Sequence, residues 1–326
     1  MRVMKYFDKL GQYYCTMRQE NANAPGKGHV YFDFLRSFVL YGSTISDYFQ
    51  YRFWEKSGFA KRGFMTARKN NRFYAQVNDL AAREKLNHKA TFNRDFAAYL
   101  KRDTLAIPGA SMEEFKAFAQ REQEFFIKPC KLGAGVGVTK YRIEDIPDCS
   151  DLYRKLNQGE YVVESCIKQD DIMASIHPQS INTVRAMTFY DGEKVEVIGA
   201  VIRCGAGDSY IDNHSAGGYT AIIDVETGRV ASCASSKWKV NVVRHPDTGV
   251  VFPGFQIPNW DKAIAMVKEA ASSLEGIHYT GCDIAFIPGD VCLVEANPSG
   301  DPVVLQEPTQ RGVKLLYDRM LRELKK

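Results

Sequence analysis

The sequence predicts an α+β fold in which the strands pair antiparallel after a mostly helical N-terminal region. Three observations favour this class: aromatic residues recur at helical intervals early in the chain, most later strands are joined by short turns, and helices are mixed with these hairpins. The chain has 326 residues, of which 45% are hydrophobic and 25% are charged. This length and composition allow two or three domains that fold without disulfides.

Helices dominate the elements expected before residue 125. Segment 31–54 spaces its aromatic residues at roughly helical intervals, and segment 76–103 continues as helix with a break near residue 87. Ser111 stands three residues before Glu114, which is the signature of a helix start. The early helices are expected either to pack as a core on the rest of the protein or to form a surface that docks on a membrane or a lipid-linked substrate.

Strands prevail after residue 125. Apolar runs bounded by turn residues predict hairpins, such as the pair that turns at Asp191-Gly192, and an apolar stripe predicts a helix over 260–274. The expected strands and hairpins are 125–129, the glycine-rich hairpin 130–141, 161–167, 183–192, 194–205, the hairpin 219–235 with its turn at Thr227-Gly228, 281–287 and 291–297, and a closing helix covers 309–326.

Charge and cysteine content exclude several function classes. The formal net charge of +4 is too mild to indicate nucleic-acid binding. The eight cysteines form no CxxC pair and no zinc-binding spacing, so we expect reduced thiols in a cytoplasmic protein. The N-terminus lacks the apolar core of a signal peptide, and no apolar run reaches the roughly 18 to 20 residues that span a bilayer.

Positive charge is concentrated in one segment of the helical region. Between Tyr51 and Arg72 there are seven Lys or Arg residues and one acid, Glu55. The segment is either a solvated face or a surface for an anionic sugar phosphate or lipid head group. This basic, aromatic region is the reason for expecting peripheral membrane contact.

Two carboxylates and an amide lie on the last pair of expected strands. Glu295 and Asn297 are two residues apart, so they project from the same face of one strand. The turn at 288–290 pairs this strand antiparallel with the preceding one and brings Asp283 alongside Glu295. Carboxylate and amide oxygens are hard ligands that Mg²⁺ accepts beside phosphates. The triplet predicts a metal site; the alternative is a set of solvent-facing strand ends.

A glycine-rich hairpin follows the strand that ends near Lys128. Gly133, Gly135 and Gly137 allow the backbone to approach a polyphosphate and to aim N–H groups at it, and Lys128 adds positive charge. The hairpin runs from strand to strand, so it matches neither the P-loop nor the dinucleotide-binding pattern. It predicts a loop that covers phosphates, with an ordinary β-turn as the alternative.

Three further features carry polar groups out of apolar strands. The strand 161–167 is typical of a connection whose backbone pairs with adenine while a neighbouring acid holds the ribose; alone, it is a buried strand with a charged end. Arg185 lies within an apolar strand, where it binds phosphate or carboxylate oxygens or forms a structural ion pair. The long polar connection after Arg203 contains Asn213 and a Gly-Gly pair, which predicts a substrate or phosphate loop.

Taken in order, these motifs resemble the ATP-grasp superfamily. The order is K-P and G-x-G-x-G, then V-V-E, an arginine-bearing strand, N-x-x-x-G-G and D…E-x-N-P, between residues 128 and 298. The segments FPGFQIPNWDKA and GCDIAF…LVEANPSGD resemble the sugar-transfer-associated branch, which is linked to polysaccharide biosynthesis. The resemblance is strong from about residue 100 onwards.

The resemblance implies a fold in which two α+β lobes with antiparallel sheets grip ATP. The implied parts are a helical region over 1–103, a small ATP-binding lid over 104–165 and a catalytic subdomain over 166–326. The implied cofactors are ATP and Mg²⁺, with Mn²⁺ as a second suitable ion. The implied nucleotide ligands are Lys89, Lys128, Gly133, Gly135, Gly137, Glu164, Ser165, Cys166, Ile167 and Asp171; the catalytic residues are Arg185, Arg203 and Asn213; and the metal ligands are Asp283, Glu295 and Asn297.

The same resemblance implies a ligase that joins a carboxylate to an amine through an acyl phosphate. Such chemistry needs no Ser or Cys nucleophile, and His214 is either a helper in amine deprotonation or a plain loop residue. The expected substrate is a sugar acid or an amino acid, free or lipid-linked, in surface polysaccharide biosynthesis. Two alternatives stay open, namely a kinase that phosphorylates a hydroxyl and a non-catalytic module that binds nucleotide.

Overall fold

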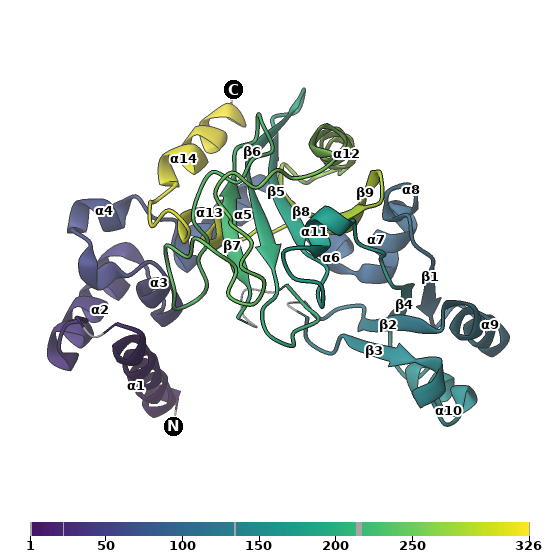
Figure 1. Ribbon diagram of the computed structural model, residues 1–326. Coiled ribbons are helices and arrows are strands. Elements are labelled where there is room, and N and C mark those ends of the chain that lie inside the picture. Colours follow the sequence, from purple (N-terminus) through teal and green to yellow (C-terminus); the bar gives the residue numbers. More distant parts are fainter. Residues whose placement is uncertain (1, 22, 134, 213–216, 326) are drawn as a thin grey trace.

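The protein is described here from a computed structural model that covers residues 2–21, 23–133, 135–212 and 217–325. A helical region, a four-stranded sheet and a five-stranded sheet follow one another in the chain. In Figure 1 the larger sheet occupies the centre, with the helices of residues 2–62 on one side of it and the smaller sheet, together with the helices of residues 80–100, on the other. The α+β class with antiparallel sheets after a helical N-terminal region, predicted from the sequence, is confirmed.

Short helices form the first hundred residues. The aromatic segment that the sequence predicts as helical is divided at Gly42, whose positive φ of 68° ends one helix and redirects the chain into the next. Phe34, Tyr48 and Phe53 are fully buried and contact one another, so this part of the aromatic pattern builds a core. The helices are α1 (Arg2–Glu20), α2 (Lys27–Tyr41), α3 (Ile45–Gln50), η1 (Phe53–Glu55), α4 (Gly58–Arg62), α5 (Ala67–Val77), α6 (Leu80–Asn87), α7 (Lys89–Asp95) and α8 (Ala97–Leu100).

The smaller sheet is antiparallel, with the strand order β1-β4-β2-β3. Its helix α9 begins at the predicted capping box, in which the Ser111 and Glu114 side chains each accept from the other's backbone N–H. Phe115, Phe125 and Val163 pack in its core. The elements are β1 (Thr104–Ile107), α9 (Met112–Glu122), β2 (Glu124–Pro129), β3 (Thr139–Arg142), η2 (Ile143–Asp145), α10 (Cys149–Leu156) and β4 (Tyr161–Ser165).

The larger sheet is also antiparallel, with the order β7-β6-β5-β8-β9. The predicted hairpin over 219–235 forms only its first strand, because its second half makes isolated bridges at Val230 and Ser235. The large apolar cluster on this sheet includes Val184, Ile284 and Val267 of the covering helix α12. The elements are α11 (Asp171–Ala174), β5 (Thr183–Tyr190), β6 (Val195–Cys204), β7 (Tyr219–Ile223), α12 (Trp260–Ser272), β8 (Tyr279–Ile287) and β9 (Asp290–Asn297).

The C-terminal segment returns to the helical region. It contains α13 (Val303–Gln306) and α14 (Lys314–Glu323), so the predicted closing helix begins five residues later than expected and follows a turn. Gln306 is fully buried; its Nε2 donates to Tyr51 Oη at 2.8 Å and its Oε1 accepts from the Met65 backbone at 2.8 Å. In the described part of the chain, every helix is too short or too polar to cross a bilayer.

Candidate active site

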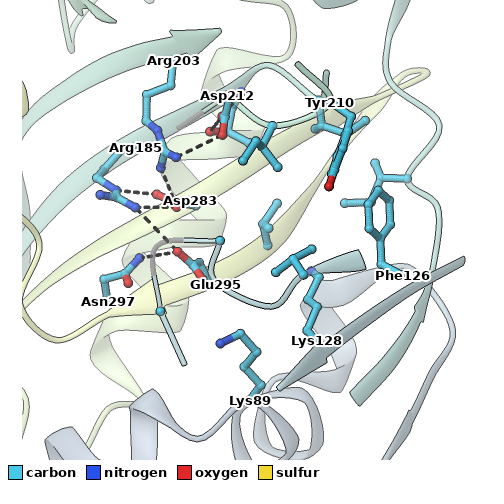
Figure 2. A pocket seen from close by; sticks show the side chains of 18 of the residues that line it. Lys89, Phe126, Lys128, Arg185, Arg203, Tyr210, Asp212, Asp283, Glu295 and Asn297 are labelled. Carbon is cyan, nitrogen blue, oxygen red and sulfur yellow. Dashed lines mark hydrogen bonds and ion pairs between the residues drawn. The ribbon is translucent and has the colours of Figure 1, made fainter. Parts of the chain in front are cut away.

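A cavity of about 520 Å³ opens between the two sheets, and all three parts of the chain line it. The smaller sheet contributes Phe126 and Lys128, and the larger sheet contributes arginines and carboxylates. Ser46 and Gln50 of α3, in the helical region, also line the cavity. Figure 2 shows the acidic and arginine side chains of the larger sheet on one wall, with Lys89 and Lys128 below them.

The hairpin β8–β9 brings two carboxylates together. Asp283 lies directly opposite Glu295 in the antiparallel register, and a bulge follows between Asp283 and Ile284. Asn297 lies two residues further along β9, and its Nδ2 donates to Glu295 Oε1 at 3.0 Å. The predicted position of Asp283 alongside Glu295 is therefore confirmed.

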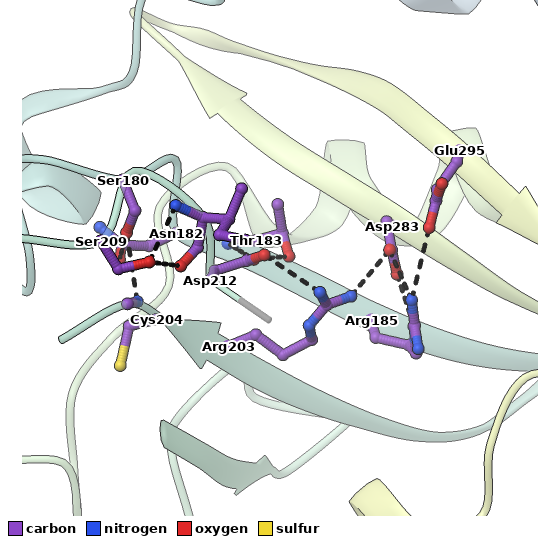
Figure 3. A network of polar contacts seen from close by, with 12 residues as sticks. Ser180, Asn182, Thr183, Arg185, Arg203, Cys204, Ser209, Asp212, Asp283 and Glu295 are labelled. Atoms are coloured by element: carbon purple, nitrogen blue, oxygen red, sulfur yellow. Dashed lines mark hydrogen bonds and ion pairs between the residues drawn. The ribbon is translucent and has the colours of Figure 1, made fainter. Parts of the chain in front are cut away.

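Two arginines grip Asp283 from the neighbouring strands, as Figure 3 shows. Arg185 on β5 donates from Nε and Nη2 to the two oxygens of Asp283, each at 2.6 Å. Arg203 on β6 donates to Asp283 Oδ2 at 2.7 Å and to Asp212 Oδ1 at 3.0 Å. Asp212 also accepts from the Thr183 backbone. Arg185 thus forms an ion pair and still lines the cavity, which combines the two interpretations left open for it.

These contacts push the two carboxyl groups in opposite directions. Burial acts to raise the pKa of Asp283, but Arg185 and Arg203 outweigh it and lower that pKa to about 2. The pKa of Glu295 is raised, first by its position deep in the molecule and then by the negative charge of Asp283. Its side chain is nevertheless 42% exposed, because it faces the cavity. Glu295 is therefore the carboxylate that is open to an incoming group.

A second buried ion cluster anchors Lys128. Glu164 on β4 accepts from Lys128 Nζ at 2.7 Å, from Arg102 Nε at 3.0 Å and from Asn93 Nδ2 at 3.0 Å. Burial opposes ionisation of Glu164, yet Arg102 and Lys128 hold its pKa well below the usual range. These contacts show that Glu164 positions Lys128. The ribose contact suggested for Glu164 or a nearby acid such as Asp171 stays a prediction.

Arg102 links the two sheets across the cavity. Besides Glu164 of the smaller sheet, its guanidinium reaches the carbonyl oxygens of Leu293 and Val294 on β9, at 2.8 and 3.1 Å. The side chain is only 2% exposed. Arg102 therefore fixes the position of Lys128 relative to the acidic pair.

Lys89 and the glycine hairpin cover the other side of the cavity. Lys89, the first residue of α7, donates from Nζ to the Leu132 carbonyl, and burial lowers its pKa. Gly135 and Gly137 have φ values of 76° and 75°, which few other residues adopt. A Cβ at Gly137 would lie 2.8 Å from Pro129 Cγ, so this turn is closely packed on the strand before it.

The structure brings most of the sequence-predicted residues to this cavity, but not all of them. Its lining includes the following predicted residues: Lys89, Lys128, Gly133, Gly135, Glu164, Ser165, Ile167, Arg185, Arg203, Asp283, Glu295 and Asn297. Gly137 supports the hairpin from outside the lining, and Cys166 and Asp171 do not line the cavity. Asn213 and His214 lie outside the described residues.

A family model described as sugar-transfer associated ATP-grasp matches residues 68–320. This match covers well over half of the chain. The chain belongs to the sugar-transfer associated ATP-grasp family. The search of curated proteins found no match.

Several solved structures are remotely similar to this family member. The ATP-grasp ligase PsnB, in complex with a minimal precursor, has a TM-score of 0.47 at 16% identity over 76% of this chain, which spans 64% of the PsnB chain. D-alanyl-alanine synthetase A from Vibrio cholerae has a TM-score of 0.45 at 12% identity, over 77% of this chain and 68% of that one. D-cycloserine synthetase DcsG has a TM-score of 0.42 at 15% identity, over 78% and 80% of the two chains.

The oxygen donors of this ATP-grasp protein fit a divalent metal ion. Glu295 exposes its carboxylate to the cavity, Asn297 uses its amide nitrogen on Glu295 and so keeps its amide oxygen, and a cation would relieve the repulsion between Glu295 and Asp283. Within the described ranges, no three Asp, Glu, His or Cys side chains gather as a metal cluster. A metal here depends on two carboxylates and one amide.

Sequence reasoning missed several residues of this ATP-grasp site. Arg102 and Asp212 are single charged residues outside any motif, and their roles follow only from the meeting of distant strands. Ser46 and Gln50 belong to a short helix in the region where motifs are few. The aromatic pair Phe126 and Tyr210, with ring centroids 6.4 Å apart, connects β2 to the loop after β6. In the sequence, the signal for this pair was an aromatic residue, Tyr210, within an otherwise polar loop.

Proposed function

We propose that this protein is an ATP- and Mg²⁺-dependent ligase that joins a carboxylate to an amine through an acyl phosphate. One observation carries the proposal: a buried arginine–carboxylate network on the larger sheet faces two lysines and a glycine hairpin across a single cavity. Cations on both sides of a cavity suit a reaction in which phosphate charge is transferred. Membership in the ATP-grasp family supports ATP as the phosphoryl donor.

The first step activates the acid. A carboxylate oxygen of the substrate attacks the γ-phosphorus of ATP, the bond between that phosphorus and the bridging oxygen breaks, and ADP leaves. Lys89 and Lys128 would neutralise the phosphate oxygens, and the N–H groups of the glycine hairpin would cover them. Mg²⁺, held by Asp283, Glu295 and Asn297, would supply further charge neutralisation when bound.

The second step forms the amide. The nitrogen of a neutral amine attacks the acyl carbon, the bond from that carbon to the phosphate oxygen breaks, and the nitrogen's proton passes to the departing phosphate. Arg185 and Arg203 would stabilise the oxygens that gain charge, because both guanidiniums are held rigidly by Asp283. Closure of the hairpin would exclude water, which otherwise hydrolyses the acyl phosphate.

The acid substrate, which accepts the phosphoryl group and is called the acceptor below, is proposed to bind on the side of the cavity that the helical region lines. Ser46 and Gln50 offer hydrogen bonds there, beside Val303 and Val304 from the C-terminal segment. A polyhydroxylated acid fits such mixed polar and apolar lining. We therefore propose a sugar acid or amino acid of surface polysaccharide biosynthesis, free or lipid-linked. A cytoplasmic site of action agrees with the eight free cysteines.

The decisive test is whether product formation depends on both substrates. Purified protein is incubated with ATP, Mg²⁺, a panel of sugar acids and amino acids, and a panel of amines, while ADP and phosphate are measured. We expect ADP release to require one acid and to yield an amide with one amine. Glu295→Gln should abolish turnover, and the exposed control Glu193→Gln should not. A stable phosphoester product would instead establish a kinase, and full activity of Glu295→Gln would refute the site.

A further inference from the structure

The outward face of α2 is apolar, although the protein leaves it uncovered. Val30 and Phe34 point into the core of the helical region. On the opposite side Phe32 is 65% exposed and Val39 is 71% exposed, and Leu35 lies exposed between them at helical spacing. A helix that only covers a core needs one apolar side, so the second side requires a partner.

Helix α4 lies beside α2 and adds a further exposed apolar side chain. Phe59 is 88% exposed, more than any other large apolar side chain in the described ranges. α4 is held beside α2 by the ion pair between Lys61 Nζ and Asp33 at 2.6 Å, and Gly58 packs against the Tyr41 hydroxyl. The α2–α4 face is defined by five exposed residues: Phe32, Leu35, Val39, Leu40 and Phe59.

Positive charge accompanies the α2–α4 face. Arg36 lies exposed on α2 with its guanidinium 5.9 Å from the Phe32 ring, and Arg62 lies exposed at the end of α4. The single acid between Tyr51 and Arg72 is paired with Arg52. Lys61, one of the basic residues that the sequence places on a solvated face, is instead buried against Asp33. Glu55 and Asp33 are thus paired with basic side chains, whereas Arg36 and Arg62 expose positive charge beside the apolar residues.

We propose that the α2–α4 face docks on an anionic membrane surface. Exposed apolar side chains bordered by arginines match the boundary between acyl chains and negatively charged head groups. The same helical region carries α3, whose Ser46 and Gln50 line the cavity. The proposal concerns surface residues that do not line the cavity, and it stands or fails independently of the ligase chemistry.

Vesicle flotation tests this proposal on the full chain. We expect the protein to float with vesicles of phosphatidylglycerol and phosphatidylcholine in equal parts, and not with phosphatidylcholine alone. The triple variant Phe32→Ser, Val39→Ser, Phe59→Ser should bind at least about tenfold more weakly, because three side chains lose their insertion. Arg36→Gln and Arg62→Gln should each weaken binding roughly fivefold, and added salt should do the same.

Matched controls separate docking from general hydrophobicity. Leu315→Ser removes an apolar side chain that is 82% exposed on α14, and it should leave flotation unchanged. Equal thermal melting of all variants verifies that they fold. Equal flotation of the triple variant and the wild type would overturn the proposal, as would no flotation at all. If the wild type does not float and light scattering shows that it is a dimer, whereas the triple variant is a monomer, the face contacts a second copy of this chain instead.

Discussion

At the scale of single residues, the opposite environments of Asp283 and Glu295 determine the chemistry. Arginine contacts keep Asp283 ionised, whereas Glu295 faces the cavity beside it with its pKa raised. Ionisation of Glu295 therefore costs the folded protein stability, and a bound cation would offset that cost. A carboxylate that lowers the stability of the folded protein in this way is typical of a functional site.

Replacing Glu295 by Gln should separate stability from activity. A raised pKa means that the folded state holds the proton more tightly, so the wild type loses stability as the pH rises above the ordinary value of 4.5. We expect Glu295→Gln to match the wild type in thermal melting near pH 4 and to exceed it at pH 7 without ligand. Turnover should fall by about 10³-fold or more, below what the assay detects. A variant that melts lower than the wild type at pH 7 would contradict this account.

Replacing Glu164 by Ala should destabilise the protein and not merely weaken nucleotide binding. Removal of Glu164 leaves Arg102 buried without its carboxylate partner and frees Lys128. Breaking a buried pair in this way costs about 3–5 kcal/mol in the free energy of unfolding. Urea denaturation measures that loss, with Asp151→Ala, which removes a surface ion pair, as the control. If Glu164→Ala keeps full stability and loses only ATP affinity, Glu164 contacts the ribose.

At the scale of elements, the hairpin after β2 and the pair β8–β9 carry the site. Both were predictable, because glycine spacing and the alternation of strand side chains are local properties of the sequence. The partners of Glu164 were not predictable: Asn93 lies on α7 and Arg102 in the connection before β1, 71 and 62 residues away in the sequence. The split of the aromatic segment at Gly42 was missed for another reason, since a single left-handed glycine does not interrupt aromatic spacing.

The hairpin offers a matched pair of glycine substitutions. Gly137 has a positive φ, and a Cβ there would contact Pro129, whereas a Cβ at Gly133 meets open space. Gly137→Ala should strain the loop by about 1–2 kcal/mol and raise the KM for ATP, while Gly133→Ala, which adds no strain, should raise it less. Steady-state kinetics with both variants measures this difference. Similar kinetics for the two would show that the shape of the turn does not matter for nucleotide binding.

At the scale of the whole molecule, the C-terminal segment holds the helical region against the catalytic sheet. Gln306 bridges Tyr51 and Met65 in a fully buried setting, and the Lys314 backbone donates to Gly63 O at 2.9 Å. This joint also positions α3, which lines the cavity. The helical region therefore contributes to the candidate active site. The first hundred residues contain few motifs, so the sequence did not predict this contribution.

Gln306→Ala tests this coupling. The substitution leaves the Met65 N–H without its buried acceptor, and we expect a loss of about 1–3 kcal/mol in the free energy of unfolding. Because α3 lines the part of the cavity proposed for the acid substrate, the KM for the acid should rise more than the KM for ATP. Equal changes in both constants would indicate that the helical region only stabilises the fold.

The central claim is that phosphoryl transfer from ATP activates a carboxylate in this cavity. Hydroxylamine trapping tests it most directly. Protein, ATP, Mg²⁺ and the acid substrate are mixed with hydroxylamine in place of the amine substrate, and the hydroxamate is measured by mass spectrometry. We predict hydroxamate formed together with ADP by the wild type and none by Glu295→Gln. ADP formed with a stable phosphorylated hydroxyl and no hydroxamate would contradict the account.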